Sequence, residues 1–222
     1  MAHAVYQRWF LQFDFPTGEG NYYKTNGGKF LFDCSLKKNI PIGWKVCSLS
    51  DLISKVSNSH DYSMDLPTVD LSIMASGDVS INQFNRSKDF ATNLFALEKG
   101  NILFGAIRPY LKKCCVAPCD GAMTGTVYQF KPKSKNYFGY ALSTMSNDFF
   151  FDYAVKISKG TKMPVVSDKD LLNFKVPFDE EIIKKFNELP FIHLLINTTM
   201  MSYKLNELKN RLIPLLINQQ LA

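Results

Sequence analysis

The segment Phe191–Leu216, FIHLLINTTMMSYKLNELKNRLIPLL, decides how the rest of this chain is interpreted. Read with a seven-residue repeat, it places apolar residues at alternating spacings of three and four, with a single polar exception. These positions are Phe191, Leu194, Thr198, Met201, Leu205, Leu208, Leu212 and Leu215. Such a pattern is typical of a coiled coil, in which a second helix covers the apolar seam.

A helix from Pro190 to Gln219 would be about 45 Å long, which exceeds most helices of globular proteins. Pro190 suits the first turn, whereas Pro214 removes a backbone hydrogen bond and is expected to bend or loosen the last turn. One interpretation is an ordinary helix whose apolar stripe packs in the core of this chain. Its place after a globular part favours the other interpretation, a spacer or dimerisation helix.

The composition indicates a folded protein with a basic surplus. The chain has 222 residues, 46% of them hydrophobic, which suits one domain with a sizeable core plus an appendage. The net charge of +6 suggests a polyanionic partner, although many basic globular proteins bind none. No apolar run is long enough to cross a bilayer, and the start lacks the layout of a signal peptide. We therefore expect a cytoplasmic protein without a membrane partner.

The five cysteines are an odd number, which is consistent with reduced thiols. Cys114, Cys115 and Cys119 are close in sequence, but they lack the paired spacing and the adjacent histidine of a zinc site. We therefore expect buried or half-buried thiols, no metal and no cofactor.

The periodicity predicts three segments. Residues 1–17 hold a short amphipathic helix that must pack on another element, either the long helix or a partner's long helix. Residues 18–178 form the globular part, an α+β domain with a mainly β core, and residues 179–222 form a helical arm. Strands are expected at 29–34, 45–49, 68–73, 94–97, 102–107, 114–117, 126–130 and 174–176. Helices are expected at 50–56, 137–153 and 168–173, and a turn at 40–44.

No motif of a catalytic site stands out. The chain lacks Gly-x-Ser-x-Gly, His-Glu-x-x-His, a phosphate-binding lysine loop and a dinucleotide fingerprint. It also lacks an Asn-Pro-Pro-aromatic methyltransferase motif, and its three histidines are scattered. The sequence therefore predicts a protein that is not an enzyme.

Positive charge is instead placed on three predicted loops. The first carries Arg108, Tyr110, Lys112 and Lys113, the second carries Lys159, Thr161 and Lys162, and the third carries Arg86 and Lys88. Basic and hydroxyl side chains on loops are the groups that contact phosphates and position a protein on DNA. The alternative is a solvated, lysine-rich surface, with the ring of Tyr110 in the core rather than on a base.

Seven stretches carry a resemblance to a known family by their order along the chain. They are Tyr6–Pro16, Gly27–Lys29, Ile40–Trp44, Gly100–Lys112, Gly160–Pro164, Leu171–Pro177 and Leu205–Leu216. Together they resemble the specificity subunit of type I restriction-modification systems, specifically its C-terminal half. In that family, two target recognition domains each read half of a bipartite DNA sequence. Two long helices form an antiparallel coiled coil that separates the domains and docks methyltransferase subunits.

This chain resembles one recognition domain with one long helix, without the first recognition domain. The resemblance therefore implies either a half-subunit that forms a homodimer or a fragment of a longer subunit. It also implies a non-catalytic reader of double-stranded DNA that directs a methyltransferase (M) subunit and, where one is present, a restriction (R) subunit. The nine residues of the three basic loops would contact DNA. The apolar seam residues, Trp9 and Phe10 would form the dimer or partner interface.

Two identical readers related by a two-fold axis would read an inverted repeat, with half-sites roughly a dozen base pairs apart for a 45 Å rod. An alternative from another class is a protein–protein adaptor or decoy that uses the coiled-coil face and does not bind DNA. A combined restriction–methylation enzyme is a third hypothesis, which the missing methyltransferase motif disfavours.

Overall fold

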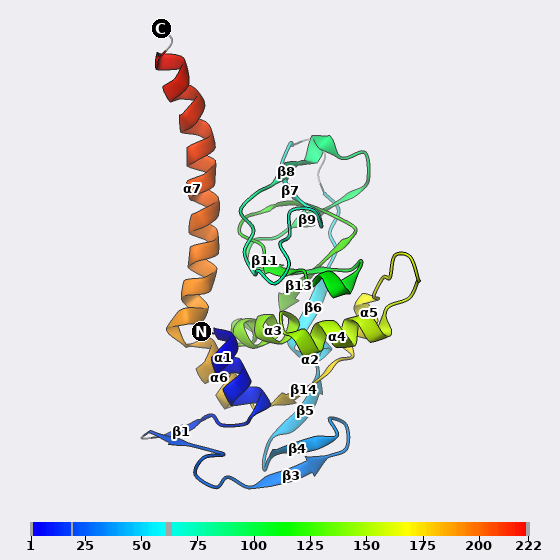
Figure 1. Cartoon of the computed structure of the whole chain (residues 1–222), viewed down its shortest axis with the longest axis vertical. Helices are drawn as coiled ribbons and strands as arrows, with labels where there is room; N and C mark the ends of the chain where they lie inside the picture. The colour runs from blue at the N-terminus through cyan, green and yellow to red at the C-terminus, as the bar shows by residue number, and fades with distance from the viewer. Residues whose placement is uncertain (1, 19, 61–63, 221–222) are drawn as a thin grey trace.

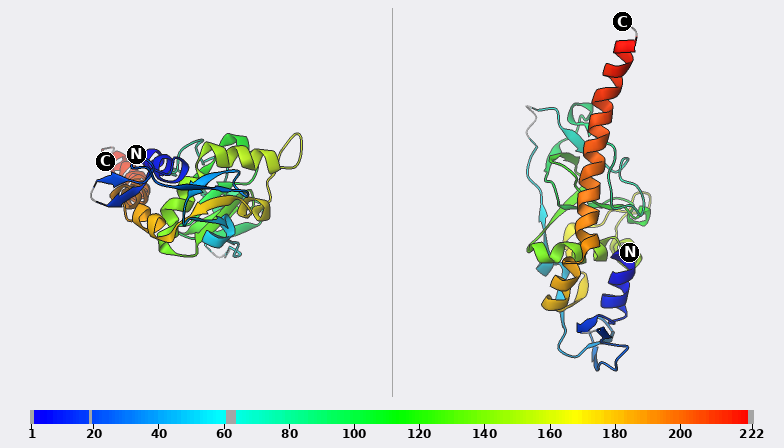
Figure 2. Two further views of the ribbon diagram at one scale, coloured as in Figure 1. Left: turned by 90° about the horizontal axis from the view of Figure 1, so that it is seen from below. Right: turned by 90° about the vertical axis from the view of Figure 1, so that its left-hand side faces the viewer.

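The computed structural model describes residues 2–18, 20–60 and 64–220. Figure 1 shows a globular part beside a long C-terminal helix, α7 (Pro190–Gln220), which starts near the N-terminus and projects beyond the β-rich part. The two further views in Figure 2 agree with this arrangement. The predicted α+β fold class, with a β core and a long terminal helix, is confirmed.

The base of the molecule is built from both ends of the globular part. The predicted N-terminal helix is present as α1 (Ala2–Tyr6), which continues into a π-helical turn, η1 (Gln7–Leu11). Two antiparallel hairpins follow, β1 (Pro16–Gly18) with β2 (Asn21–Tyr22) and β3 (Phe30–Asp33) with β4 (Lys38–Pro41). β5 (Lys45–Ser48) then pairs with β14 (Lys175–Phe178), which closes the base.

Two four-stranded sheets form the β-rich part above this base. One has the order β11-β10-β13-β6, and the other has the order β8-β7-β12-β9. The strands of the first sheet are β6 (Ile53–Val56), β10 (Ile102–Gly105), β11 (Cys114–Val116) and β13 (Val127–Pro132). Those of the second are β7 (Pro67–Val69), β8 (Asn85–Arg86), β9 (Leu94–Leu97) and β12 (Gly121–Thr124). Short 3₁₀ turns, η2 (Ser87–Asp89), η3 (Pro109–Leu111) and η4 (Lys135–Tyr137), connect them to their neighbours.

Four of the remaining helices lie between the sheets and the base, namely α2 (Leu49–Leu52), α3 (Phe138–Met145), α4 (Asp148–Ile157) and α5 (Asp168–Leu172). The helix α6 (Glu180–Asn187) belongs to the base, at the level of α1 (Figure 1). The start of α6 is fixed by the Asp179 carboxylate, which accepts a hydrogen bond from the Ile182 N–H at 2.9 Å. Its acidic first turn, with Glu180 and Glu181, suits the positive end of a helix.

The structure corrects several predicted elements. The helix expected at 50–56 is only the single turn α2, because the β-branched Ile53 and Val56 continue as β6 and pair with β13. The turn expected at 40–44 is wrong at its start, since β4 extends through Pro41. Pro177 does not end its strand but lies within β14, in a two-stranded sheet where a missing N–H is tolerated. The strand β12 was missed.

The single helix expected at 137–153 is two helices, α3 and α4. At the break, the Ser146 hydroxyl donates to the Leu142 carbonyl at 2.8 Å, and Asn147 takes an extended conformation. Such a bond from a hydroxyl to the carbonyl four residues earlier slightly destabilises a helix, and here it accompanies the end of α3. The break turns α4 so that its first residue, Asp148, reaches the loop around η3.

The largest hydrophobic core joins residues from all three predicted segments. Phe10 has no exposed surface, and its ring lies 4.5 Å from Tyr140 and 5.3 Å from Phe186 between ring centroids. Trp9 is also buried and packs edge-on against Phe186. Both side chains therefore belong to the core of this chain rather than to a surface that a partner reaches, which corrects their assignment to the interface. The segment boundaries at 17/18 and 178/179 stay a prediction.

Candidate nucleic-acid interface and association helix

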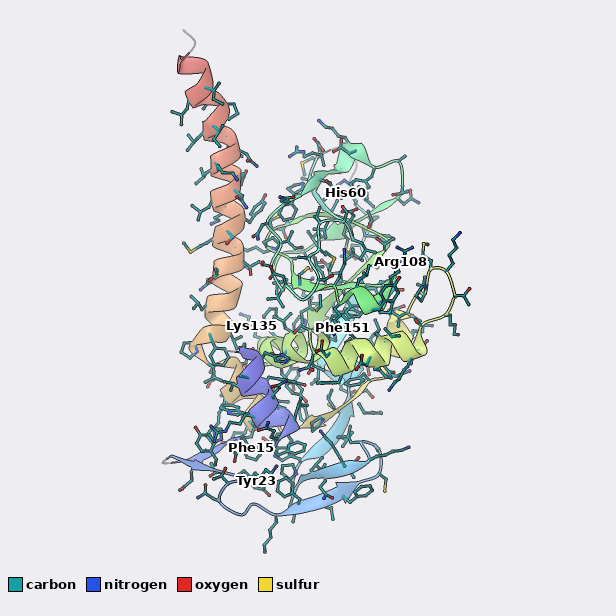
Figure 3. The ribbon with its side chains drawn as sticks, viewed as in Figure 1. Phe15, Tyr23, His60, Arg108, Lys135 and Phe151 are labelled. Atoms are coloured by element: carbon teal, nitrogen blue, oxygen red, sulfur yellow. The ribbon has the colours of Figure 1, made fainter. Side chains whose placement is uncertain are left out.

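The structure brings two of the three predicted basic loops together. The Arg108 N–H donates to the Pro164 carbonyl at 2.7 Å, and Val165 forms isolated β-bridges with both Ile107 and Lys159. The loop after β10 and the loop after α4 are therefore fixed side by side, although about fifty residues separate them in the chain. Figure 3 shows Arg108 at this edge of the β-rich part, above α4.

The joined loops present a basic and polar surface to solvent. Its exposed members are Arg108, Tyr110, Lys159, Thr161 and Lys162. Tyr110 is 51% exposed, so its ring is at the surface and not in the core. Guanidinium, ammonium, hydroxyl and aromatic groups together are the kinds of side chain that meet phosphates and bases. We name these five residues the joined-loop surface.

Two further lysines of the first loop are held by groups of this chain. The Lys112 ammonium lies 2.6 Å from an Asp148 carboxylate oxygen, and this hydrogen bond raises the pKa of Lys112 and lowers that of Asp148. The Lys113 ammonium donates to the Leu71 carbonyl. Lys113 is therefore part of the framework of the loop, and we leave it out of the set that we propose to contact DNA.

The third predicted loop lies elsewhere, at the end of the β-rich part that carries β8 (Figure 1). Arg86 and Lys88 are exposed there, but both pair with Asp65, at 2.9 Å and 3.5 Å. The hydrogen bond from Arg86 lowers the pKa of the Asp65 carboxyl. These two residues are therefore not part of the joined-loop surface.

One lysine that the sequence analysis did not select belongs beside this surface. Lys156 is exposed in the last turn of α4 and leads directly into the second loop. The repeat of lysine at 156, 159 and 162 was a signal that could have revealed it. The left-handed backbone of Arg108, with φ of 52°, had no comparable signal in the sequence.

The apolar seam of α7 is uncovered in the single chain. Its exposed large side chains are Leu194, Met201, Leu205, Leu208, Leu212 and Leu215, of which the least exposed is still 52% accessible. Phe191 is half-buried at the start of the helix, where its ring lies 6.2 Å from that of Phe186. The helix continues through Pro214 to Gln220, so the bend or loosening expected at Pro214 does not interrupt it. The interpretation of α7 as an ordinary core helix is therefore wrong.

A different face of α7 contacts the β-rich part. The Tyr203 ring packs edge-on against Phe84, with centroids 5.0 Å apart, and the Asn206 side-chain amide donates to the Asn82 carbonyl at 2.9 Å. Burial and the neighbouring Cys119 raise the pKa of Tyr203 to about 12. A polar cavity of about 740 Å³ opens beside these contacts, between α7 and the loop before β8. The rod is thus attached by one face while its seam is left to solvent.

Within the described part of the chain, no three His, Cys, Asp or Glu side chains gather closely enough to hold a metal ion. All five cysteines are free, and burial raises the pKa of the Cys114 and Cys115 thiols. None of the helices in that same part is long and apolar enough to span a membrane.

The fold thus defines a class of protein: an α+β module that has a basic surface on two joined loops and a long helix with an uncovered apolar seam.

No protein-family model matches the sequence. Among curated proteins, the chain is similar to the specificity subunit of the type I restriction enzyme EcoDI from Escherichia coli, with 25% identity over 160 residues. The match covers 68% of this chain and 36% of that protein, so the chain spans about a third of the curated relative. The resemblance to type I specificity subunits is confirmed.

Three solved structures are also similar. The HsdS subunit from Thermoanaerobacter tengcongensis has a TM-score of 0.47 and 13% identity, over 91% of this chain and 45% of that one. A chain from a structure of type I R-M complex assembly and conformational transition has a TM-score of 0.49 and 15% identity, over 95% and 49%. The S subunit of a type I system from M. genitalium has a TM-score of 0.38 and 12% identity, over 63% and 35%.

Proposed function

We propose that this chain reads double-stranded DNA as a specificity subunit of a type I restriction-modification complex. The observation that carries the proposal is the joining of two basic loops into one exposed surface by the Arg108–Pro164 hydrogen bond. A single surface with cationic, hydroxyl and aromatic groups suits a duplex better than scattered lysines do, because phosphate and base contacts must be made together. The similarity to a specificity subunit over 160 residues supports the same function.

In this proposal the recognition domain spans residues 18–178, and the chain is not itself an enzyme. It directs an M subunit and, where one is present, an R subunit to a bipartite site. The long helix serves as the spacer. Its uncovered seam supports association, since exposed apolar stripes of this length are rare on monomeric proteins.

A second copy of the chain is the proposed occupant of the seam. Two copies related by a two-fold axis carry identical recognition domains, and these read the same bases on opposite strands. The target is then an inverted repeat with an unread spacer. Methylome sequencing of cells that carry this chain with its methyltransferase tests the symmetry. An asymmetric methylated motif would contradict the homodimer and would point to pairing with a different subunit.

The DNA-reading function is tested by measuring duplex binding of the purified chain, with and without an M subunit, at several salt concentrations. A DNA reader shows an affinity that falls steeply with salt, because bound phosphates release counterions. The test variant is Lys162→Ala on the joined-loop surface, and the matched control is Lys24→Ala, which changes an exposed lysine in the loop after β2. Association through α7 without any DNA binding would instead support the adaptor or decoy.

A further inference from the structure

Arg108 differs from the other arginines of this chain. There are four, and three are paired with carboxylates: Arg8 with Asp14, Arg86 with Asp65 and Arg211 with Glu207. Of the four arginines, all of which lie within residues 2–18, 20–60 and 64–220, Arg108 alone has no carboxylate partner among those residues, and its side chain is exposed. Its guanidinium is therefore the one that remains free to bind a group from outside the chain.

The backbone of Arg108 is held in an unfavourable conformation. Its φ of 52° and ψ of 60° lie in the left-handed region, which glycine and asparagine adopt far more readily than arginine. It also precedes Pro109, and a residue before proline is normally extended. Such strain persists only where the surroundings enforce it, and it is concentrated at sites of function. The chain therefore places an arginine where a glycine would be less strained.

Contacts on every side enforce this conformation. The Arg108 N–H is bonded to Pro164 at 2.7 Å, and its carbonyl accepts from the Leu111 N–H at 2.9 Å, which closes the turn η3. Pro109 is buried, so the turn is seated on the domain. At the far end of the turn, Lys112 is tied through its side chain to Asp148 on α4 and through its carbonyl to the Gly77 N–H at 3.0 Å. The root of the Arg108 side chain is thus fixed to two other elements.

We propose that Arg108 determines sequence specificity by reading a guanine through the major groove, an inference that rests on the proposed DNA-reading function. The guanidinium carries two parallel N–H donors, which match the O6 and N7 acceptors of guanine and no other base. A base contact of this kind requires a side chain whose root does not move, and the turn provides it. Lys159 and Lys162 flank Gly160, with φ of 101°, on a loop with fewer side-chain ties, and as point charges they suit phosphates.

The lysine Lys112 is a positioning residue in this proposal. Its ammonium is already bonded to Asp148, so it holds the turn rather than reading a base. Substitution of Asp148 by Asn keeps a hydrogen-bond acceptor but removes the charge. We expect it to reduce the preference for guanine over the other bases less than loss of Arg108 does.

The test is a selection from a library of randomised DNA duplexes by the purified full chain, followed by sequencing of the bound fraction. The variants are Arg108→Gly and Arg108→Asn, both of which suit the left-handed backbone and leave the turn intact. A thermal melt of each variant, no lower than that of the wild type, shows that the turn is kept. We expect a preference for guanine at one position of each half-site to fall by about tenfold to a hundredfold, while the other positions keep theirs.

Lys162→Ala is the matched control, since it removes one charge from the same surface and is expected to weaken all sequences about equally. If the selected motif is unchanged in both Arg108 variants, or if the base preference falls equally at every position, the assignment of Arg108 is overturned while the DNA-reading function stands. A wild-type chain that selects no sequence at all overturns the DNA-reading function itself, and the role of Arg108 with it.

Discussion

Replacing Leu208 by Asp tests the association helix most directly. Leu208 lies near the middle of the uncovered seam and is 53% exposed in the single chain. Complete burial of a leucine is worth about 1.5–3 kcal/mol, so covering the exposed half contributes about 1 kcal/mol from each helix. Both helices of a symmetric pair lose this contribution. An unpaired carboxylate inside an apolar seam adds a further cost of several kcal/mol.

The sum is at least about 3 kcal/mol, which corresponds to a dissociation constant raised about a hundredfold or more. Because the seam is exposed in the single chain, the globular part should stay folded. Light scattering over a range of protein concentrations measures the association, and a pull-down measures binding of an M subunit. Asn210→Asp is the matched control, since it adds a carboxylate two residues further on, at an exposed site outside the seam. Unchanged light scattering together with an unchanged pull-down for Leu208→Asp would refute the role of the seam.

Three further outcomes are expected. Lys162→Ala should reduce the slope of log affinity against log salt by about one, whereas Lys24→Ala should leave it unchanged; equal slopes in a titration series would exclude a phosphate contact at Lys162. Phe10→Ala should lower the free energy of unfolding by about 3–5 kcal/mol in a denaturant titration, because the ring is enclosed by other aromatic rings, and a loss below 1 kcal/mol would contradict its place in the core. At pH 8, iodoacetamide should label the exposed Cys34 well before Cys114, whose pKa is raised by burial and whose thiolate is therefore scarce, as mass spectrometry of digests would show.

The sequence predicted the elements whose signal is local. The heptad pattern of α7 and the short, mostly apolar runs of β9 and β10 are local signals, and the structure has all three elements. The errors occur where distant residues decide. The segment Ile53–Val56 becomes a strand because it pairs with β13. The strand β12 forms because it pairs with both β7 and β9, and its own sequence carries no strand pattern that predicts it.

The sequence could predict the residues of the candidate site, but not which of the three basic loops lie together in space. The sequence indicated three basic loops with equal weight, because charge on a loop is visible in the chain and its ion pairs are not. The contacts of Arg108 with Pro164 and of Ile107 with Val165 show which two loops meet, and the ion pairs with Asp65 show that both cations of the third loop already have a partner in this chain. The burial of Trp9 and Phe10 against Phe186 was likewise hidden, since an amphipathic helix does not reveal which surface covers it.

The two faces of α7 together determine how far apart two recognition domains would lie. If Phe191–Leu215 meets itself in reverse, the two-fold axis passes beside Tyr203, midway between those residues. Charge favours this order, because Lys204, Glu207, Lys209 and Arg211 all follow Tyr203 and would meet an opposing half without Lys, Arg, Asp or Glu. The contact of Tyr203 with Phe84 holds the β-rich part of each chain beside the middle of the rod. For a duplex that lies along the rod, the half-sites are therefore closer than the dozen base pairs that its length alone gives. In such a dimer, the spacing between half-sites would follow from where the rod is attached rather than from how long it is.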